Sequence, residues 1–181
     1  EPLGYELKAR LDLIIQSVTR FWDQGLHNYF TNHGPSHSER VHRQKLAQLA
    51  QELPEKERLS EDEIFIVSAA ARLYDIGLQS PNVEPPIVDF YYKPGDSLAF
   101  TQLQQIREKK HLLTERLILN SIRNDYRGVS LGLGTDAYTR CIAEVCRWCS
   151  EEPLDRVPLT IPVNNLLVRV RLLVALLRLA D

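Results

Sequence analysis

Residues 69–77 read AAARLYDIG, a stretch that sets one acid, Asp75, among small and apolar residues. Such neighbours predict that Asp75 is buried. A buried carboxylate is costly unless a cation, hydrogen-bond donors or a metal ion compensates its charge. Asp181 repeats the situation at the end of a second apolar run, LLVALLRLAD at residues 172–181. Each acid therefore predicts either a buried salt bridge or a metal site.

The residues around this stretch predict an all-α protein. Ser60 and Glu63 have the spacing of a capping box at the start of the helix that leads to Asp75, and Gly77 is a stop signal. Apolar residues recur at helical spacing over 3–30, 37–53, 98–125, 136–150 and 163–180. The proline-rich stretch 80–97 predicts a long loop, a feature often used as a lid or binding loop. We expect a single-domain bundle of about six or seven helices over residues 1–181, with 1–32 forming its N-terminal helices.

Composition narrows the functional classes. The net charge of −2 offers no basic surface for nucleic acid or acidic membranes. Polar and charged residues interrupt the apolar run 163–180, so it predicts a buried helix rather than a membrane span. Cys141, Cys146 and Cys149 lie on one expected helix, which argues against disulfides and for the cytoplasm. The chain has no methionine and stops within a helical pattern, so we expect the natural protein to be longer and to carry other domains.

The histidines supply candidate ligands. His33 and His37 flank a Gly-Pro turn, so His37 alone points clearly from a helix. His42 lies about 140° round that helix from His37, so these two do not share a face. A helical histidine alone is more often a surface or core residue than a ligand. Together, however, His37, His111 and the two acids form a mixed nitrogen and oxygen donor set that suits divalent transition metals.

The residues leave a second interpretation open for the two acids. Each can instead pair with an arginine in a buried salt bridge. The candidates for such a pair are Arg40, Arg72, Arg107 and Arg178.

Five segments, taken in order, resemble the HD superfamily of metal-dependent phosphohydrolases. They are HSERV at 37–41, AAARLYDIG at 69–77, IREKKH at 106–111, AEVCRWCS at 143–150 and LLRLAD at 176–181. The resemblance covers residues 33–181. It implies a helical bundle that holds one or two divalent metals and hydrolyses phosphomonoesters or phosphodiesters, often of nucleotides.

The resemblance also implies residue roles. His37, Asp75 and Asp181 correspond to metal ligands, and Asp75 to one that can bridge two ions. His111 corresponds to a ligand of a second ion or a hydrogen-bond partner of the substrate. Arg107, one helical turn earlier, corresponds to a phosphate-binding residue, which places Arg107 and His111 in the catalytic machinery.

Two positions depart from the family pattern. Tyr74 stands where the family has the histidine of its His-Asp pair, and a neutral phenol is a poor ligand. Cys149 stands where a further histidine is expected, although a thiolate binds zinc or iron well. Both changes argue against a two-metal centre of hard oxygen ligands.

We therefore favour a non-catalytic HD-type module for ligand sensing, oligomerisation or docking within a larger protein. In this interpretation Tyr74 fills the space of the missing histidine, Asp75 bonds to an arginine or a hydroxyl, and no metal is tightly bound. The alternative is an active phosphohydrolase for a nucleotide or phosphate ester. Its reduced, mononuclear site of His37, Asp75, Asp181 and Cys149 would hold one Mn, Fe, Ni or Zn ion. A third interpretation is a plain helical adaptor in which the pattern is coincidental.

Overall fold

The computed structural model of the protein describes residues 3–23, 26, 29–30, 33–93, 95–121, 131–134 and 136–181. Its elements are α1 (Tyr5–Trp22), α2 (Pro35–Arg40), the π-helix η3 (Val41–Leu46), α3 (Ala47–Glu52), η4 (Glu55–Glu57), α4 (Glu61–Leu73), η5 (Ile76–Gln79), α5 (Phe100–Glu108), α6 (Lys110–Ser121), α7 (Ala137–Arg147), η6 (Leu154–Arg156), β1 (Ile161–Val163), β2 (Leu166–Val168) and α8 (Val170–Ala180). The fold is all-α, as expected, apart from one small antiparallel hairpin.

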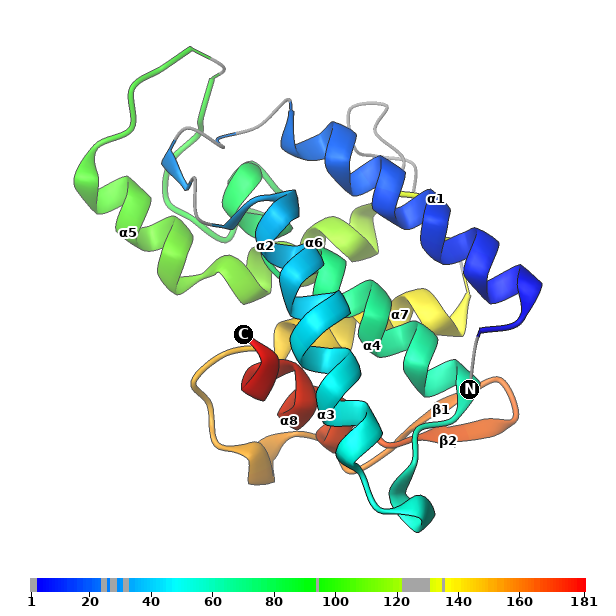
Figure 1. The fold of residues 1–181 in the computed structure, drawn as a ribbon. Coiled ribbons are helices and arrows are strands. Elements are labelled where there is room, and N and C mark those ends of the chain that lie inside the picture. Colours follow the sequence, from blue (N-terminus) through cyan, green and yellow to red (C-terminus); the bar gives the residue numbers. More distant parts are fainter. Residues whose placement is uncertain are drawn as a thin grey trace.

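Helix α4 is the centre of the bundle. It contacts α1, α2, α7 and α8, and nearly all of its side chains are buried. The run Ala69–Ala71 explains this position, because side chains this small let neighbouring helices approach from several directions. Figure 1 shows α4 running behind the α2–η3–α3 segment, with α1 along one side of the molecule. The residues that follow α4, Tyr74 and Asp75, are therefore carried into the interior.

The start of α4 has the predicted capping box. Glu63 N donates to Ser60 Oγ and Ser60 N donates to the Glu63 carboxylate. The same carboxylate also accepts from the Arg169 guanidinium at 2.7 Å. This contact joins the start of α4 to the residue just before α8, so the two helices that carry Asp75 and Asp181 are held together at this end.

Three predicted helices differ from those observed. The helix over 37–53 runs from Pro35 to Glu52 and has a π-helical middle, Val41–Leu46. The helix over 98–125 is two helices, because Lys109 has the non-helical angles φ −102° and ψ 10°; residues 122–125 lie outside the described residues. The final helix begins only at Val170, since Asn164, with φ 53°, turns the preceding residues into the β1–β2 hairpin.

The predicted loop over 80–97 has no helix or strand in its described residues. Asn82 holds it closed, because its side chain accepts from Tyr92 N at 2.8 Å and donates to Tyr92 O. With α5, this loop forms one end of the molecule, opposite the hairpin (Figure 1). Within the described residues, we find no helix with the length and apolar character that crossing a membrane requires.

Gly77 was predicted to end the helix that leads to Asp75, but its role in the structure is to allow close packing of α6. Helix α4 already ends at Leu73, and Gly77 lies in η5, where α6 packs directly against it. A Cβ at Gly77 would lie 2.3 Å from the Lys110 carbonyl oxygen and 2.7 Å from Thr114 N. Thr114 Oγ1 accepts from Gly77 N at 2.9 Å and donates to Tyr74 O at 3.0 Å. The glycine thus lets α6 begin beside Asp75.

Candidate functional site

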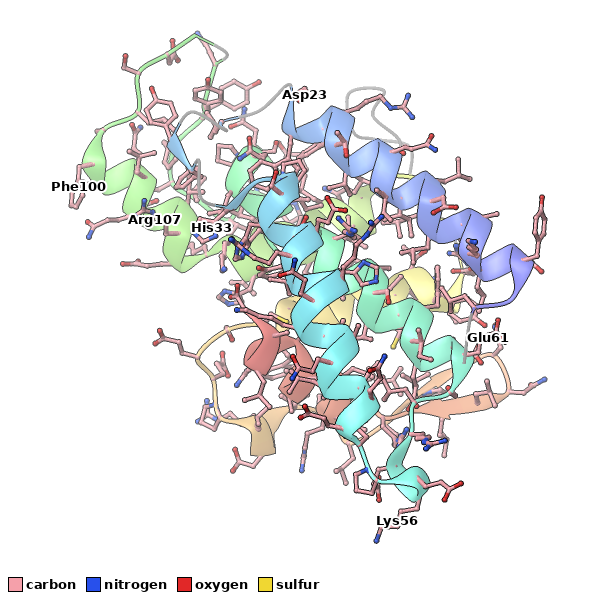
Figure 2. All side chains as sticks on the ribbon, in the orientation of Figure 1. Asp23, His33, Lys56, Glu61, Phe100 and Arg107 are labelled. Atoms are coloured by element: carbon pink, nitrogen blue, oxygen red, sulfur yellow. The ribbon has the colours of Figure 1, made fainter. Side chains whose placement is uncertain are left out.

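Four parts of the fold meet around Asp75. The segment at the start of α2 brings His33 and His37, the end of α4 brings Tyr74 and Asp75, α6 begins with Lys110, and α8 is followed by Asp181. Figure 2 labels His33, just before α2, and Arg107 on α5.

Asp75 is buried, with 2% of its surface exposed, and both of its carboxylate oxygens are bonded. Lys110 Nζ donates to Oδ1 at 2.7 Å, and His33 Nδ1 donates to Oδ2 at 3.1 Å. Burial by itself would raise the pKa of Asp75, but the His33 hydrogen bond and the Lys110 charge outweigh it and hold that pKa below its ordinary value. Asp75 is therefore an ionised carboxylate with a cation attached.

The cation on Asp75 is a lysine rather than an arginine. The four candidate arginines have other described contacts: Arg40 bonds to His37, Arg72 to His42, and Arg178 to the carbonyls of Trp148 and Glu152, while Arg107 stacks 5.5 Å from the centre of the Phe30 ring. The predicted salt bridge at Asp75 is confirmed, but the predicted partner, an arginine, was wrong.

Tyr74 lies between the second acid and the second histidine. Its hydroxyl donates to Asp181 Oδ1 at 2.7 Å and is 2.6 Å from His37 Nε2. Burial, followed by the charges of Asp75 and Asp181, raises the pKa of Tyr74 well above its ordinary value. The phenol is therefore neutral at physiological pH and acts as a hydrogen-bond donor, not as a ligand.

Three side chains in this region can offer donor atoms to a single metal ion. One ligand atom from each of His33, His37 and Asp75 lies within 4.8 Å of the others. Two nitrogens and one carboxylate oxygen fit one divalent transition metal. They do not fit a pair of ions, because Lys110 and His33 already take the two oxygens of Asp75. A bound metal would have to displace at least part of this network.

The other predicted ligands lie at different distances from this set. Asp181 is at its edge, with Oδ1 3.0 Å from His37 Nε2. Cys149 is not part of the three-residue set, and its Sγ donates to Val145 O at 3.2 Å. Burial raises the pKa of the Cys149 thiol to about 12, so at neutral pH it is not a thiolate. The metal-binding roles of Asp181 and Cys149 remain predictions.

Arg107 and His111 do not share one helix face as the sequence spacing predicted. Arg107 is on α5 and His111 is on α6, because the chain breaks at Lys109. Burial, together with the charges of Lys110 and Arg147, lowers the pKa of His111. The catalytic roles assigned to Arg107 and His111 also remain predictions.

The sequence interpretation missed two central residues, His33 and Lys110. The signal for His33 was its position just before the Gly34-Pro35 turn, where a chain reversal can bring it beside His37; their ring centroids are 5.6 Å apart. Lys110 had no such signal, because only the break at Lys109 brings it, at the first position of α6, to Asp75.

Cationic groups surround the two acids. Lys110 bonds to Asp75, Arg40 Nη2 lies 3.3 Å from His37 Nδ1, and Lys45 Nζ donates to the Asp181 backbone oxygen at 3.0 Å. Because Arg40 can only donate, His37 in its neutral form carries its proton on Nε2. The site thus combines one acid paired with a cation, Asp75, and a basic rim of Arg40 and Lys45, which suits an anionic ligand.

Comparison with known proteins identifies the family of the chain. Residues 26–181 match the family described as HD-CE. No curated protein and no solved structure gave a match. The matched residues include His33, His37, Tyr74, Asp75, Lys110 and Asp181. Because the match covers most of the chain, the protein belongs to the HD-CE family, whose members are HD-like domains.

Proposed function

We propose that this chain is a non-catalytic HD-type module of the cytoplasm that binds a phosphate-containing ligand, such as a nucleotide. The observation that carries the proposal is the 2.7 Å contact between Lys110 Nζ and Asp75 Oδ1. It places an ammonium group on the acid that a metal-dependent enzyme needs for its ion. The three unpaired cysteines suit the reducing cytoplasm.

An ammonium group does not replace a metal in hydrolysis. A metal ion lowers the pKa of its bound water to near neutrality and so creates a hydroxide nucleophile. Lys110 neutralises the charge of Asp75 but offers no vacant coordination position for water. The neutral phenol of Tyr74 adds a further donor between His37 and Asp181. The network therefore supports binding more than turnover.

The basic rim supports an anionic ligand. Arg40 and Lys45 lie on the α2–η3 segment, and both contact residues of the site. A guanidinium binds two phosphate oxygens through parallel hydrogen bonds, and an ammonium adds a point charge. A phosphate that docks between Arg40, Lys45 and Lys110 would meet three cations and no acid that lacks a partner.

One observation favours a second candidate, the mononuclear phosphohydrolase for a nucleotide or phosphate ester. His33, His37 and Asp75 can supply three ligand atoms to one Mn, Fe, Ni or Zn ion. With Nδ1 of His33 bonded to Asp75, the neutral ring keeps a lone pair on Nε2, an arrangement that orients metal-binding imidazoles. This candidate requires the ion to compete with Lys110.

Binding and turnover of adenosine monophosphate test the proposal directly. We expect calorimetry to detect binding to the unaltered protein and a phosphate assay with Mn²⁺ to detect no release above the protein-free rate. Arg40→Gln should raise the dissociation constant about tenfold, since it removes one charge-assisted bond. The control is Arg43→Gln, because Arg43 pairs with Glu39. If the protein instead released phosphate in a metal-dependent way and Asp75→Asn abolished this release, the protein would be a phosphohydrolase.

Tyr74→His is expected to create metal retention. Imidazole is shorter than phenol, so the substitution opens space beside His37 and Asp181 and adds a nitrogen ligand there. After dialysis against zinc-free buffer, the variant should keep about one equivalent of zinc, because zinc prefers four ligands. Tyr74→Phe is the control, because it removes the hydroxyl without adding a ligand. Equal, negligible zinc in both variants would contradict this view of Tyr74.

A further inference from the structure

Arg72, on α4, is a buried cation that forms no ion pair with any residue the structure describes. Only 6% of its surface is exposed, and its Nε donates to His42 Nδ1 at 3.2 Å. Among the residues that the structure describes, no carboxylate forms an ion pair with it; the nearby Glu39 pairs with Arg43 at 3.1 Å. Buried charges in proteins are normally paired. The environment of Arg72 is therefore suited to an anion that is not part of the described chain.

His42 adds a hydrogen-bond donor next to this charge. Burial, followed by the charges of Arg72 and Arg43, lowers the pKa of His42 to about 4, so the ring is neutral at pH 7. Because the Arg72 Nε–H points to Nδ1, the proton of the neutral ring lies on Nε2. Within the described part of the chain, Nε2 has no hydrogen-bond acceptor.

A cavity adjoins His42; Arg72 contacts His42 but does not itself line the cavity. Its volume is about 150 Å³, and it lies between the η3–α3 segment and α4. His42 and Ser68 provide its polar side, and Leu46, Ala50, Ile64 and Val67 provide apolar walls. Ser68 is one helical turn before Arg72 on α4. An apolar cavity of this size can hold a molecule about as large as benzene.

The local backbone is also unusual here. His42 and Leu46 both belong to the π-helix η3. Such π-helical turns are rare and occur frequently at functional sites. The cavity and the π-helix share His42 and Leu46, and the Arg72 guanidinium is joined to them through its bond to His42.

From these features we propose that the cavity binds a small carboxylate with a short apolar tail. The carboxylate accepts from His42 Nε2 and the Ser68 hydroxyl and lies within the field of the Arg72 charge. The tail lies among Leu46, Ala50 and Val67. A bare phosphate would leave the apolar walls uncovered, and a neutral molecule would leave Arg72 without an anion. The site is separate from the Asp75 site, and the proposal does not depend on what binds there.

Two probes of nearly equal shape test the role of the charge. Butyrate and butyramide are titrated separately into the full chain, and the amide signals of the protein are followed by NMR. We expect butyrate to bind about tenfold more tightly than butyramide, since it gains charge-assisted bonds. The shifted signals should include Ser68 and Val67. Equal affinities, or butyrate shifts confined to the residues around Asp75, would overturn the proposal.

Filling the cavity tests the location. Ala50→Leu places extra methyl groups against the apolar walls and leaves Arg72 and His42 unchanged. It should raise the butyrate dissociation constant about tenfold or more, because the tail loses its space. Ala9→Leu, at an exposed position of α1, is the control and should not change it. A folded Ala50→Leu variant that binds butyrate as tightly as the unaltered protein would overturn the proposal. The comparison of the two probes decides the question if Ala50→Leu does not fold.

Discussion

Lys110→Met is expected to lower the free energy of unfolding by about 3 kcal/mol or more at pH 7, because it leaves a buried carboxylate without its cation. Asp75 has 2% of its surface exposed, and Lys110 supplies the shorter of its two bonds. Methionine keeps much of the lysine side-chain volume, so the loss reports the charge rather than a cavity. Urea denaturation followed by circular dichroism measures it.

Lys109→Met is the matched control for this variant. Lys109 Nζ donates to the Ile87 carbonyl oxygen at 2.9 Å, so its loss removes a bond to a neutral acceptor. We expect a cost of about 1 kcal/mol. If both variants lost stability equally, the Lys110–Asp75 contact would not compensate a buried charge.

The pH dependence of Lys110→Met has a definite sign. In the unaltered protein the pKa of Asp75 lies below its ordinary value, so its stabilising contribution is present above that value and is lost as the pH falls through the lower, folded-state pKa. Without Lys110, burial is the largest influence and raises the pKa of Asp75. The folded variant then binds more protons than the unfolded chain, and its stability falls as the pH rises from about 4 toward neutrality. The difference between the two proteins should therefore be larger at pH 7 than at pH 4.

Gly77→Ala is expected to destabilise the protein by about 3 kcal/mol or more, because the added methyl group meets backbone atoms that cannot rotate away. The Lys110 carbonyl oxygen would lie 2.3 Å from the new Cβ. Relief requires α6 to move away from η5, which also pulls Lys110 from Asp75. Thermal and urea unfolding measure the loss.

Gly34→Ala is the control for this glycine. A Cβ at Gly34 meets no atom within 4 Å, and the residue has a negative φ of −77°. We expect a change within about 0.5 kcal/mol. A Gly77→Ala variant as stable as Gly34→Ala would mean that α6 does not pack closely on η5.

Local sequence signals predicted much of the fold correctly. The capping box of Ser60 and Glu63 depends on residues three apart, and the burial of Asp75 depends on its immediate neighbours. Both features are set by short stretches of chain. The order of the HD-like segments likewise predicted the HD-type relationship, because it reflects the sequence of helices along the chain.

Features that depend on long-range packing could not be predicted in this way. The tight contact of Gly77 with α6 joins residues more than thirty positions apart. The helix break at Lys109 is not marked by proline or glycine, yet it decides that Lys110 bonds to Asp75. The position of His33 required a turn whose direction the residue types do not determine. The donor set of His33, His37 and Asp75 therefore became visible only in three dimensions.

The metal content of the unaltered protein tests the central claim, that Lys110 and Tyr74 take the place of a metal ion in this HD-type site. The protein should be purified without a metal-affinity tag, incubated with Mn, Fe, Ni or Zn salts, desalted, and analysed by plasma mass spectrometry. Our account predicts less than about a tenth of an equivalent of any of these metals, because an ion must displace Lys110 from Asp75 to bind. If the unaltered protein kept about one equivalent of metal and Asp75→Ala abolished this retention, the result would contradict our account. It would establish a working mononuclear centre.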